Sequence, residues 1–350
     1  MKLFQPKKRI SLKNSKGIIL ITVLWVTAVL TIIALSFAYT VKLEMKMARY
    51  QAERAAAYYL AKAGLERAIA QLEADKRSGS EVDFFGEGWA FNPSAYEDVR
   101  LFNGSYTVEV TDEAGKININ TASEGLLRAL PVIRDADHRS EICDSIADWI
   151  DADDNRRLNG AESAYYRSLK SPHKCKNGPM DALEELLLIK GFDMSWLYEA
   201  SDDGLAADEK TGKKSFQDEG EEARADVRLE EVITVYTDGK INVNTAGFEA
   251  LSLLLGTANR ELAQSIIDYR TGSDRTDGTG DDTPFFSIDE LKPVIGEIIY
   301  KQFSKFAGVS SNVFKIVSIG RPDNSKVTKK IEAVIDRSGY PSRIIYYRED

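Results

Sequence analysis

An acidic loop in the middle of the chain carries the residue types best suited to binding a hard cation. Four carboxylates and two amides lie within twelve residues, and Gly160 lets the chain turn among them. Calcium takes about six to eight oxygen ligands, mostly from carboxylates, amides and carbonyls. The loop therefore predicts a calcium site whose candidate ligands are Asp151, Asp153, Asp154, Asn159 and Glu162. The spacing is not that of an EF-hand, and a solvated acidic loop is the alternative interpretation.

A second acidic loop, around Gly278, is a weaker candidate for the same ion. Its carboxylates are those of Asp274, Asp277, Asp281 and Asp282. The glycines in it would let backbone carbonyls approach an ion, but a flexible turn explains this composition equally well.

Few other residues could do chemistry. Cys143 and Cys175 are the only cysteines, and they could form one disulfide in an oxidising compartment, although two unpaired thiols are also compatible with the sequence. His138 and His173 are the only histidines, and the absence of a C-x-x-C motif argues against a zinc site. Neither a G-x-S-x-G motif nor a Walker loop is present, so the sequence predicts that the protein is not an enzyme.

The N-terminal region would anchor the acidic loops to a membrane. Six basic and no acidic residues precede an uncharged stretch of 25 residues, 17–41, which is long enough to span a bilayer as a helix. The basic flank predicts a single-pass protein of the inner membrane with its N-terminus in the cytoplasm and its bulk in the periplasm. The stretch continues without proline into an amphipathic helix, so we expect one helix over 18–76.

Lys16 and Gly17 before this helix resemble a type IV prepilin leader, a short basic peptide that ends in glycine. Cleavage after Gly17 would make Ile18 the mature N-terminus and Thr22 the fifth mature residue, where most pilins have glutamate. An ordinary signal anchor is the alternative. Apolar alternation predicts strands around Val108 and over 313–319, 327–335 and 344–347, which suggests a small antiparallel sheet beside the helix. The roughly 200 residues between the first strand and the others are too many for a loop and predict an inserted domain.

The predicted insertion contains an internal repeat. The sequence G-K-I-N-I-N-T-A that begins at Gly115 recurs from Gly239 with seven of eight positions identical, and two further blocks match in the same order. Each unit is expected to hold a short strand, a capped helix, a second helix, an acidic loop and a third helix. Thr121 and Glu124 have the spacing of a capping box in the first unit. We therefore expect a fold of the α+β class, in which a type IV pilin-like core carries an inserted α-helical domain made of a duplicated helix-hairpin-helix or SAM-like unit.

Helix-hairpin-helix modules open with the same I-N-x-N-T-A pattern, which makes a DNA-binding protein one alternative. Such modules hold phosphate with a glycine-rich hairpin at a helix N-terminus, and neither unit has a Gly-x-Gly there. The net charge is −9 for the whole chain. An acidic surface repels phosphate, so we expect nucleic acid not to be a partner.

Over nearly its whole length the sequence resembles the minor pseudopilin K family of the type II secretion system. The resemblance rests on Lys16–Gly17–Ile18, on Thr22, on the run from Ile146 to Asp154, and on the segments around Asn159–Glu162 and Leu183–Leu187. It implies a pilin fold with a helical insertion, calcium bound in the first acidic loop, and cleavage and N-methylation by prepilin peptidase. It also implies assembly with pseudopilins I and J, and with H, in a tip complex that could meet secreted substrate proteins.

The resemblance gives Thr22 a physical meaning. In a pilin stack, glutamate at mature position five neutralises the N-terminal ammonium of the subunit above, and this ammonium is costly in an apolar core. A subunit without that glutamate suits the filament tip, where no subunit lies above it. The inserted domain also suits the filament tip, because its size would hinder the lateral packing of further subunits. A tip minor pilin of a type IV pilus, serving adhesion or DNA uptake, is the other alternative.

These expectations divide the chain into six parts. They are a leader (1–17), a membrane and stalk helix (18–76), a head (77–111 and 312–350), a first repeat (112–200), a polar linker (201–226) and a second repeat (227–311).

Overall fold

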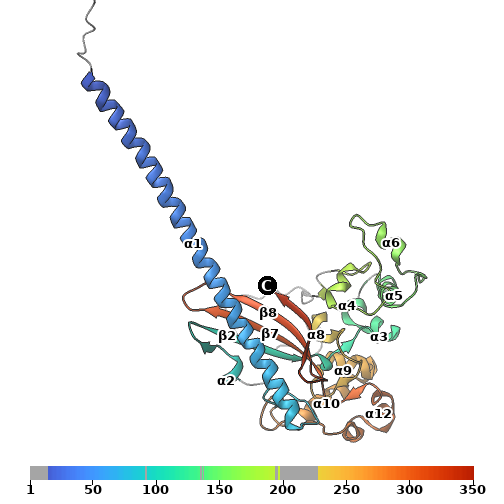
Figure 1. Ribbon diagram of the computed structural model, residues 1–350. Helices are drawn as coiled ribbons and strands as arrows, with labels where there is room; N and C mark the ends of the chain where they lie inside the picture. The colour runs from blue at the N-terminus through green and yellow to red at the C-terminus, as the bar shows by residue number, and fades with distance from the viewer. Residues whose placement is uncertain (1–14, 91–92, 135, 137, 194–195, 198–227) are drawn as a thin grey trace, which may run out of the picture.

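The computed structural model describes residues 15–90, 93–134, 136, 138–193, 196–197 and 228–350. The predicted linker and nearly all of the predicted leader lie outside these residues. Helix α1 (Ser15–Ser78) is a single helix of 64 residues that projects from the rest of the molecule (Figure 1). At 1.5 Å per residue it is about 95 Å long. It ends at Gly79, whose φ of +83° lies in the left-handed region that stops a helix.

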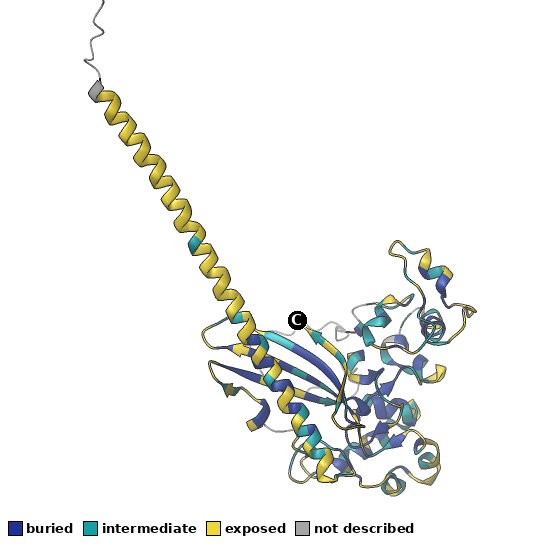
Figure 2. Ribbon diagram, viewed as in Figure 1, coloured by how far each residue is buried: buried dark blue, intermediate teal, exposed yellow. Residues whose placement is uncertain are grey.

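The two halves of α1 have different surroundings. Every side chain from Ile18 to Thr40 is exposed, and Figure 2 shows this half standing free of the protein. Among the described residues, α1 is the one helix long and apolar enough to cross a membrane. In the second half Ala57, Ala61, Leu65, Ala68 and Leu72 are buried at three- and four-residue spacing. This spacing forms one apolar stripe, which needs a partner surface.

That partner is a five-stranded antiparallel sheet. Its strand order is β1-β2-β7-β8-β9, and α1 lies across one face (Figure 1). The strands are β1 (Val99–Leu101), β2 (Gly104–Asp112), β7 (Val313–Pro322), β8 (Lys329–Asp336) and β9 (Arg343–Glu349). Helix α2 (Pro93–Tyr96) packs beside β2. Glycines allow the close approach: a Cβ on Gly320 would lie 2.9 Å from Leu60 and would also clash with the backbone of Ala57 and Ala61. The predicted long helix with a small antiparallel sheet is confirmed.

Between β2 and β7 the chain forms the inserted helical domain as two similar units. The first contains β3 (Ile117–Asn118), α3 (Glu124–Ala129), α4 (Pro131–Arg134), α5 (Arg139–Ile150), α6 (Ser163–Arg167) and the 3-10 helix η2 (Leu183–Leu188). The second contains β5 (Ile241–Asn242), α9 (Phe248–Leu255), η3 (Thr257–Asn259), α10 (Arg260–Arg270), η4 (Ile288–Leu291), α11 (Lys292–Ile295) and α12 (Glu297–Phe303). The two units share one apolar core, which is separate from the core of the head.

Each unit is closed by a short parallel pairing. Strand β3, which follows the 3-10 helix η1 (Glu113–Gly115), pairs with β4 (Ile233–Thr234). Strand β4 follows the short helix α8 (Leu229–Val232) in the chain. Strand β5 pairs with β6 (Ala307–Gly308). Strand β4 lies in the range expected for the second repeat (227–311), but it pairs with the first unit. The predicted cap also differs: the side chain of Ser123, not Thr121, accepts from the N–H of Leu126 at the start of α3. Thr121 instead bonds to the carbonyl of Asn118.

The asparagines of the repeated motif hold each unit together. Asn120 bonds through its side chain to both the N–H and the carbonyl of Met180, at 2.8 and 3.0 Å. Asn244 makes the same two bonds with Phe285, at 2.8 and 3.0 Å. Each asparagine thus fixes the segment that returns from the acidic loop. Since these amides are bonded to the backbone, the repeated asparagines have a structural role in each unit.

Candidate metal centre

The first acidic loop joins the C-terminus of α5 to the N-terminus of α6. Asp151 follows the last residue of α5 and Glu162 precedes the first residue of α6. The carboxylates of Asp151, Asp153 and Glu162 offer oxygen atoms that all lie within 4.8 Å of one another. Three of the five predicted ligands are therefore brought together, because two helix ends and the intervening turn converge on one point.

Glu162 is the most unusual member of this group. Its side chain is buried, and neither carboxylate oxygen has a hydrogen-bond partner among the residues that the structure describes. Burial, together with the charges of the nearby carboxylates of Asp148, Asp154 and Asp151, raises the pKa of Glu162 to about 7, although the neighbouring thiol of Cys175 opposes this shift. A buried carboxylate without a partner costs free energy, and a bound cation would remove this cost.

Two further unpaired oxygens face the same region. They are Oδ1 of Asp151 and Oδ1 of Asn177, and both are buried without a partner. Asn177 reaches the loop through Nδ2, which donates to the carbonyl of Asp153 at 2.6 Å. Sequence reasoning missed Asn177, which lies well beyond the acidic loop. Its signal was the Asn-Gly pair with Gly178, which is typical of a turn, and the φ of Asn177 is +51°.

The other two predicted ligands have different partners. Oδ1 of Asp154 accepts from the N–H of Ser163 at 3.2 Å, and hydrogen bonds from Ser163 hold the pKa of Asp154 below its usual value. Asn159 donates through both its backbone N–H and its side chain to Oδ2 of Asp144, at 3.1 and 3.0 Å. Asn159 therefore braces the loop against α5, and its side chain does not join the three carboxylates.

The second acidic loop is organised as a set of turns. Oδ2 of Asp281 accepts from the backbone N–H groups of Ser273 and Asp274, at 2.8 and 3.2 Å. Asp277 pairs with the buried guanidinium of Arg270 at 3.1 Å, and Asp282 accepts from the N–H of Gly278. Asp274 accepts from the N–H of Thr276. These carboxylates bond to groups of their own loop and to Arg270 of α10, and among the described residues they are not part of a carboxylate group that converges within 4.8 Å.

The two cysteines are not joined. Both are buried free thiols. Cys143 lies within α5, where Arg128 and Asp144 are its charged neighbours, whereas Cys175 donates to the carbonyl of Asp148 at 3.6 Å. Burial raises the pKa of Cys175 to about 12, so its thiol stays protonated. The possible disulfide of the sequence analysis is therefore not formed, and the two thiols pack in different parts of the first unit.

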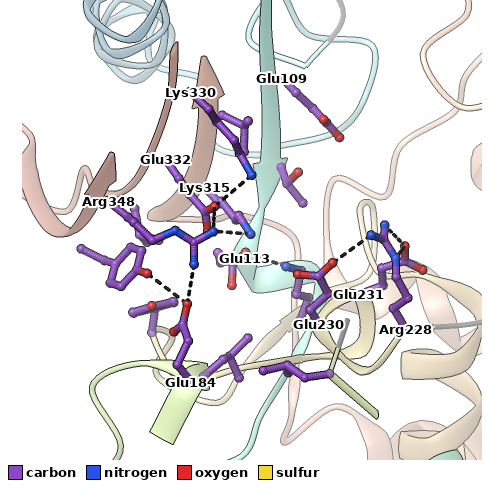
Figure 3. Close-up of a pocket in the computed structure, with 18 residues that line it drawn as sticks. Glu109, Glu113, Glu184, Arg228, Glu230, Glu231, Lys315, Lys330, Glu332 and Arg348 are labelled. Carbon is purple, nitrogen blue, oxygen red and sulfur yellow. Dashed lines mark hydrogen bonds and ion pairs between the residues drawn. The ribbon is translucent and has the colours of Figure 1, made fainter. Parts of the chain in front are cut away.

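A charged cleft lies between the insertion and the sheet face opposite α1 (Figure 3). Its volume is about 570 Å³. Arg348 on β9 bonds to Glu184 of η2 at 2.9 Å and to Glu332 on β8 at 3.1 Å, and Lys315 pairs with Glu332 at 2.9 Å. Burial by itself would raise the pKa of Glu332, but the hydrogen bond and charge of Lys315 keep it below its usual value. These paired charges join the insertion to the sheet.

Comparison with known proteins shows which protein families two segments of the chain resemble. Residues 110–200 match the family model of type II secretion system protein K, and residues 16–66 match that of the PilX N-terminal segment. Type II secretion system protein K of Pseudomonas aeruginosa is 30% identical over 201 residues, which are 51% of this chain and 58% of that protein. The protein of the same name from Pectobacterium carotovorum is 25% identical over 199 residues, 51% of this chain and 59% of that protein. The alignments thus span somewhat more than half the length of these two relatives.

The fold is also similar to a solved structure. A chain in the GspK-GspI-GspJ complex of the type 2 secretion system from enterotoxigenic Escherichia coli superposes with a TM-score of 0.63. The match covers 87% of this chain and 99% of that chain at 17% identity, so it shows a shared fold. The family model, the curated relatives and the shared fold agree with the resemblance noted in the sequence: the chain is similar to type II secretion system protein K in sequence over about half its length, and in fold.

Proposed function

We propose that this protein is a minor pseudopilin of the type II secretion system that caps the tip of the pseudopilus and starts its assembly for protein export. The observation that carries the proposal is the division of α1. From Gly17 to Thr40 it exposes only uncharged side chains, and its second half packs on a sheet whose strands are separated by the segment that matches the protein K family model. An apolar helix without protein contacts needs either a bilayer or the helices of neighbouring subunits.

Processing and orientation follow from this assignment. Prepilin peptidase cuts after Gly17 and methylates the new N-terminus at Ile18. The basic leader stays on the cytoplasmic side of the inner membrane, and the head and insertion lie in the periplasm. The relationship to protein K and the bare apolar half of α1 support this arrangement. Intact-mass spectrometry of the protein from its host should give the mass of a chain that starts at a methylated Ile18; an unprocessed chain would contradict it.

Thr22 supports a position at the tip. Its hydroxyl donates to the carbonyl of Ile18, one turn earlier in the same helix, at 2.9 Å. The side chain is therefore neutral and satisfied within its own helix, and it has no carboxylate for the ammonium of a subunit above. Partner subunits then lie below this one in the filament. We propose pseudopilins I and J, as in the GspK-GspI-GspJ complex whose chain shares this fold, together with pseudopilin H. Secreted substrate would meet the insertion.

Gold labelling of this protein in isolated filaments tests its position at the tip. Gold label on an epitope fused at the C-terminus should decorate one end of each pseudopilus, and Thr22→Val should leave this pattern unchanged because valine adds no carboxylate. A Thr22→Glu variant that lacks the insertion should move label into the shaft. Label along the shaft with the wild-type chain would refute the tip position but leave membership of the pseudopilus intact.

We further propose calcium as the ligand of the first acidic loop. Asp151, Asp153 and Glu162 would hold it with Asn177, since the three carboxylates converge and the unpaired oxygens of Asp151, Glu162 and Asn177 match the ligands that calcium prefers. Bound calcium would supply positive charge to the buried carboxylate of Glu162, whereas Asp151 already pairs with Arg157 at 2.6 Å, and the loop would gain rigidity. We propose no catalytic role for the protein and no nucleic-acid partner.

Calorimetry and thermal unfolding test the calcium proposal. Calcium at about 100 times its dissociation constant stabilises a folded protein by about 2.7 kcal/mol. We expect this stabilisation in the wild type and its loss in Glu162→Gln, which keeps the shape but removes the charge. Asp277→Asn, in the second loop, is the matched control and should bind calcium as the wild type does. Equal heats for the wild type and Glu162→Gln would exclude the site.

A further inference from the structure

A groove runs between the two units of the insertion and has no role in the proposed filament contacts. Its volume is about 600 Å³, within the range of about 300–1,000 Å³ that is usual for ligand pockets. None of its lining residues belongs to α1 or to the five-stranded sheet. Its apolar part comes from α3 and α9, namely Leu126, Ala129, Leu253 and Leu254, with the half-exposed ring of Phe306 beside them.

Reciprocal contacts between the repeated motifs fix the walls of the groove. A Cβ on Gly239 would lie 2.6 Å from Oγ1 of Thr121 in the other unit. At the equivalent place, a Cβ on Gly115 would lie 2.9 Å from the carbonyl of Thr245. The first and seventh positions of each motif thus meet the seventh and first of the other, as in a two-fold interface. Because each glycine lies this close to a threonine of the other unit, the groove is preformed.

A sequence difference between the two units leaves the groove open on the side of the first unit. Gly125 lines it, and a Cβ built there would meet no atom within 4 Å. The equivalent residue of the second unit is Glu249, which pairs with Arg260 at 2.8 Å, and Arg260 also lies over the ring of Phe248. The groove therefore depends on a small residue that the second copy of the repeat has replaced by a long, paired side chain.

The rim of the groove is positively charged in an acidic protein. Lys240 and Lys305 line it, both are exposed, and neither makes an ion pair with any residue that the structure describes. The carboxylate of Asp238 is the opposing charge, and it accepts from the backbone N–H of Lys240. The net charge of the whole chain is −9. Two unpaired ammonium groups beside an apolar floor therefore favour a ligand with an apolar body and a carboxylate.

We propose that this groove docks an apolar peptide segment that ends in a free C-terminal carboxylate. The leucines of α3 and α9 bury its side chains, and Lys240 and Lys305 bind the carboxylate. This site goes beyond the pseudopilin assignment, since it uses none of the residues that support the filament position or the calcium site.

Fluorescence anisotropy tests the proposal with the full-length chain in lipid nanodiscs. The probe is a labelled peptide of leucine and alanine that ends in glutamate with a free C-terminus, and a second peptide is neutral, with glutamine and a C-terminal amide. The blocking variant is Gly125→Trp, which fills the groove from a position with free space. Gly247→Trp is the matched control, since Gly247 is also free of neighbours within 4 Å but does not line the groove.

We expect the wild type and Gly247→Trp to bind the acidic peptide alike and Gly125→Trp to bind it at least about tenfold more weakly. The double variant Lys240→Gln, Lys305→Gln should lose the preference for the acidic over the neutral peptide, and salt should weaken wild-type binding. Equal binding to the wild type and Gly125→Trp would overturn the proposal. So would retention of duplex DNA in place of peptide, or a concentration-dependent dimer that Gly125→Trp abolishes, since a nucleic acid or a second copy would then be the occupant.

Discussion

Arg337 joins the stalk helix, the sheet and the loop that follows the helix, and its replacement by methionine is an informative perturbation. The residue follows β8 and is 2% exposed. Its guanidinium donates to Asp75 at 2.8 Å, to the carbonyl of Leu72 at 3.1 Å and to Asp83. It also lies 4.5 Å from the centre of the Phe314 ring. Methionine keeps much of the apolar contact with Phe314 but removes every one of these hydrogen bonds.

The expected loss of stability follows from what the substitution leaves behind. Asp83 is buried, and breaking a buried ion pair from one side costs about 3–5 kcal/mol because the remaining charge is uncompensated. The carbonyls of Leu72 and Ser311 lose a donor as well. We therefore expect Arg337→Met to lower the free energy of unfolding of the head by about 4 kcal/mol. Adding Asp83→Asn should recover part of this loss because the buried charge is then gone.

Urea unfolding of the soluble fragment that begins at Arg49 measures the effect. The fluorescence of Trp89 reports on the head, since this buried ring packs edge-on against Phe314 at 4.9 Å. Arg343→Met is the matched control. Its side chain is 74% exposed and pairs with Asp336 at 3.0 Å. Surface ion pairs contribute little, so we expect a change within about 0.5 kcal/mol.

The pH dependence gives a second, independent test of the same reasoning. Burial raises the pKa of Asp83 above its usual value even though Arg337 opposes this shift. Without Arg337 the folded-state pKa rises further above the unfolded value of about 3.9. Proton uptake then favours the folded state, so the loss in Arg337→Met is full above the folded pKa and shrinks as the pH falls towards 4. A loss below about 1 kcal/mol at pH 7, or one that does not shrink in acid, would refute the buried-charge account.

Three further predictions concern other buried positions. Gly320→Ala should destabilise the head by about 1–3 kcal/mol in urea unfolding, because its Cβ would strike α1, whereas Gly339→Ala, which meets no atom within 4 Å, should not; equal values would show that α1 can shift freely. Asn244→Ala should cost about 2–4 kcal/mol in the same assay, since the N–H and carbonyl of Phe285 lose their partner; a change near zero would contradict the structural role of the motif. Burial raises the pKa of Asp112 to about 6, above its usual 3.8, so its contribution to stability is full below about pH 4 and is lost as the pH rises through 6. Between pH 4 and 7 the free energy of unfolding of the wild type should therefore fall by about 2–3 kcal/mol more than that of Asp112→Asn. Parallel pH curves for the two proteins would disprove the pKa shift.

Local periodicity explains which elements could be predicted. The stripe from Ala61 to Leu72 and the alternation around Val108 are set by neighbours three, four or two residues apart, and both elements formed as expected. The repeat likewise predicted that two equivalent units would follow one another, because each copy contains most of its own contacts. Helix ends were less certain: Ser123 and Thr121 are both good capping residues, and only the path of the chain decided between them.

Contacts between distant segments could not be predicted in this way. Asn177 joins the candidate calcium site from beyond α6, whereas Asn159, inside the acidic loop, turns to Asp144 on α5. Strand β4 closes the first unit although the whole predicted linker separates it from α5. The pattern of acidic residues therefore located the loop but did not select its ligands.

The sequence by itself determined a membrane-length helix that continues as a stalk, an antiparallel sheet interrupted by a duplicated insertion, and an acidic loop between two helices. These features depend on residue periodicity, on repetition and on composition, which are all properties of short stretches of chain. Only the tertiary structure decided that Glu162 is buried without a partner, that Cys143 and Cys175 stay apart, and that Gly125 opens a groove between the repeats. Each of these depends on how far one element lies from another, and that distance is set by packing across the whole fold.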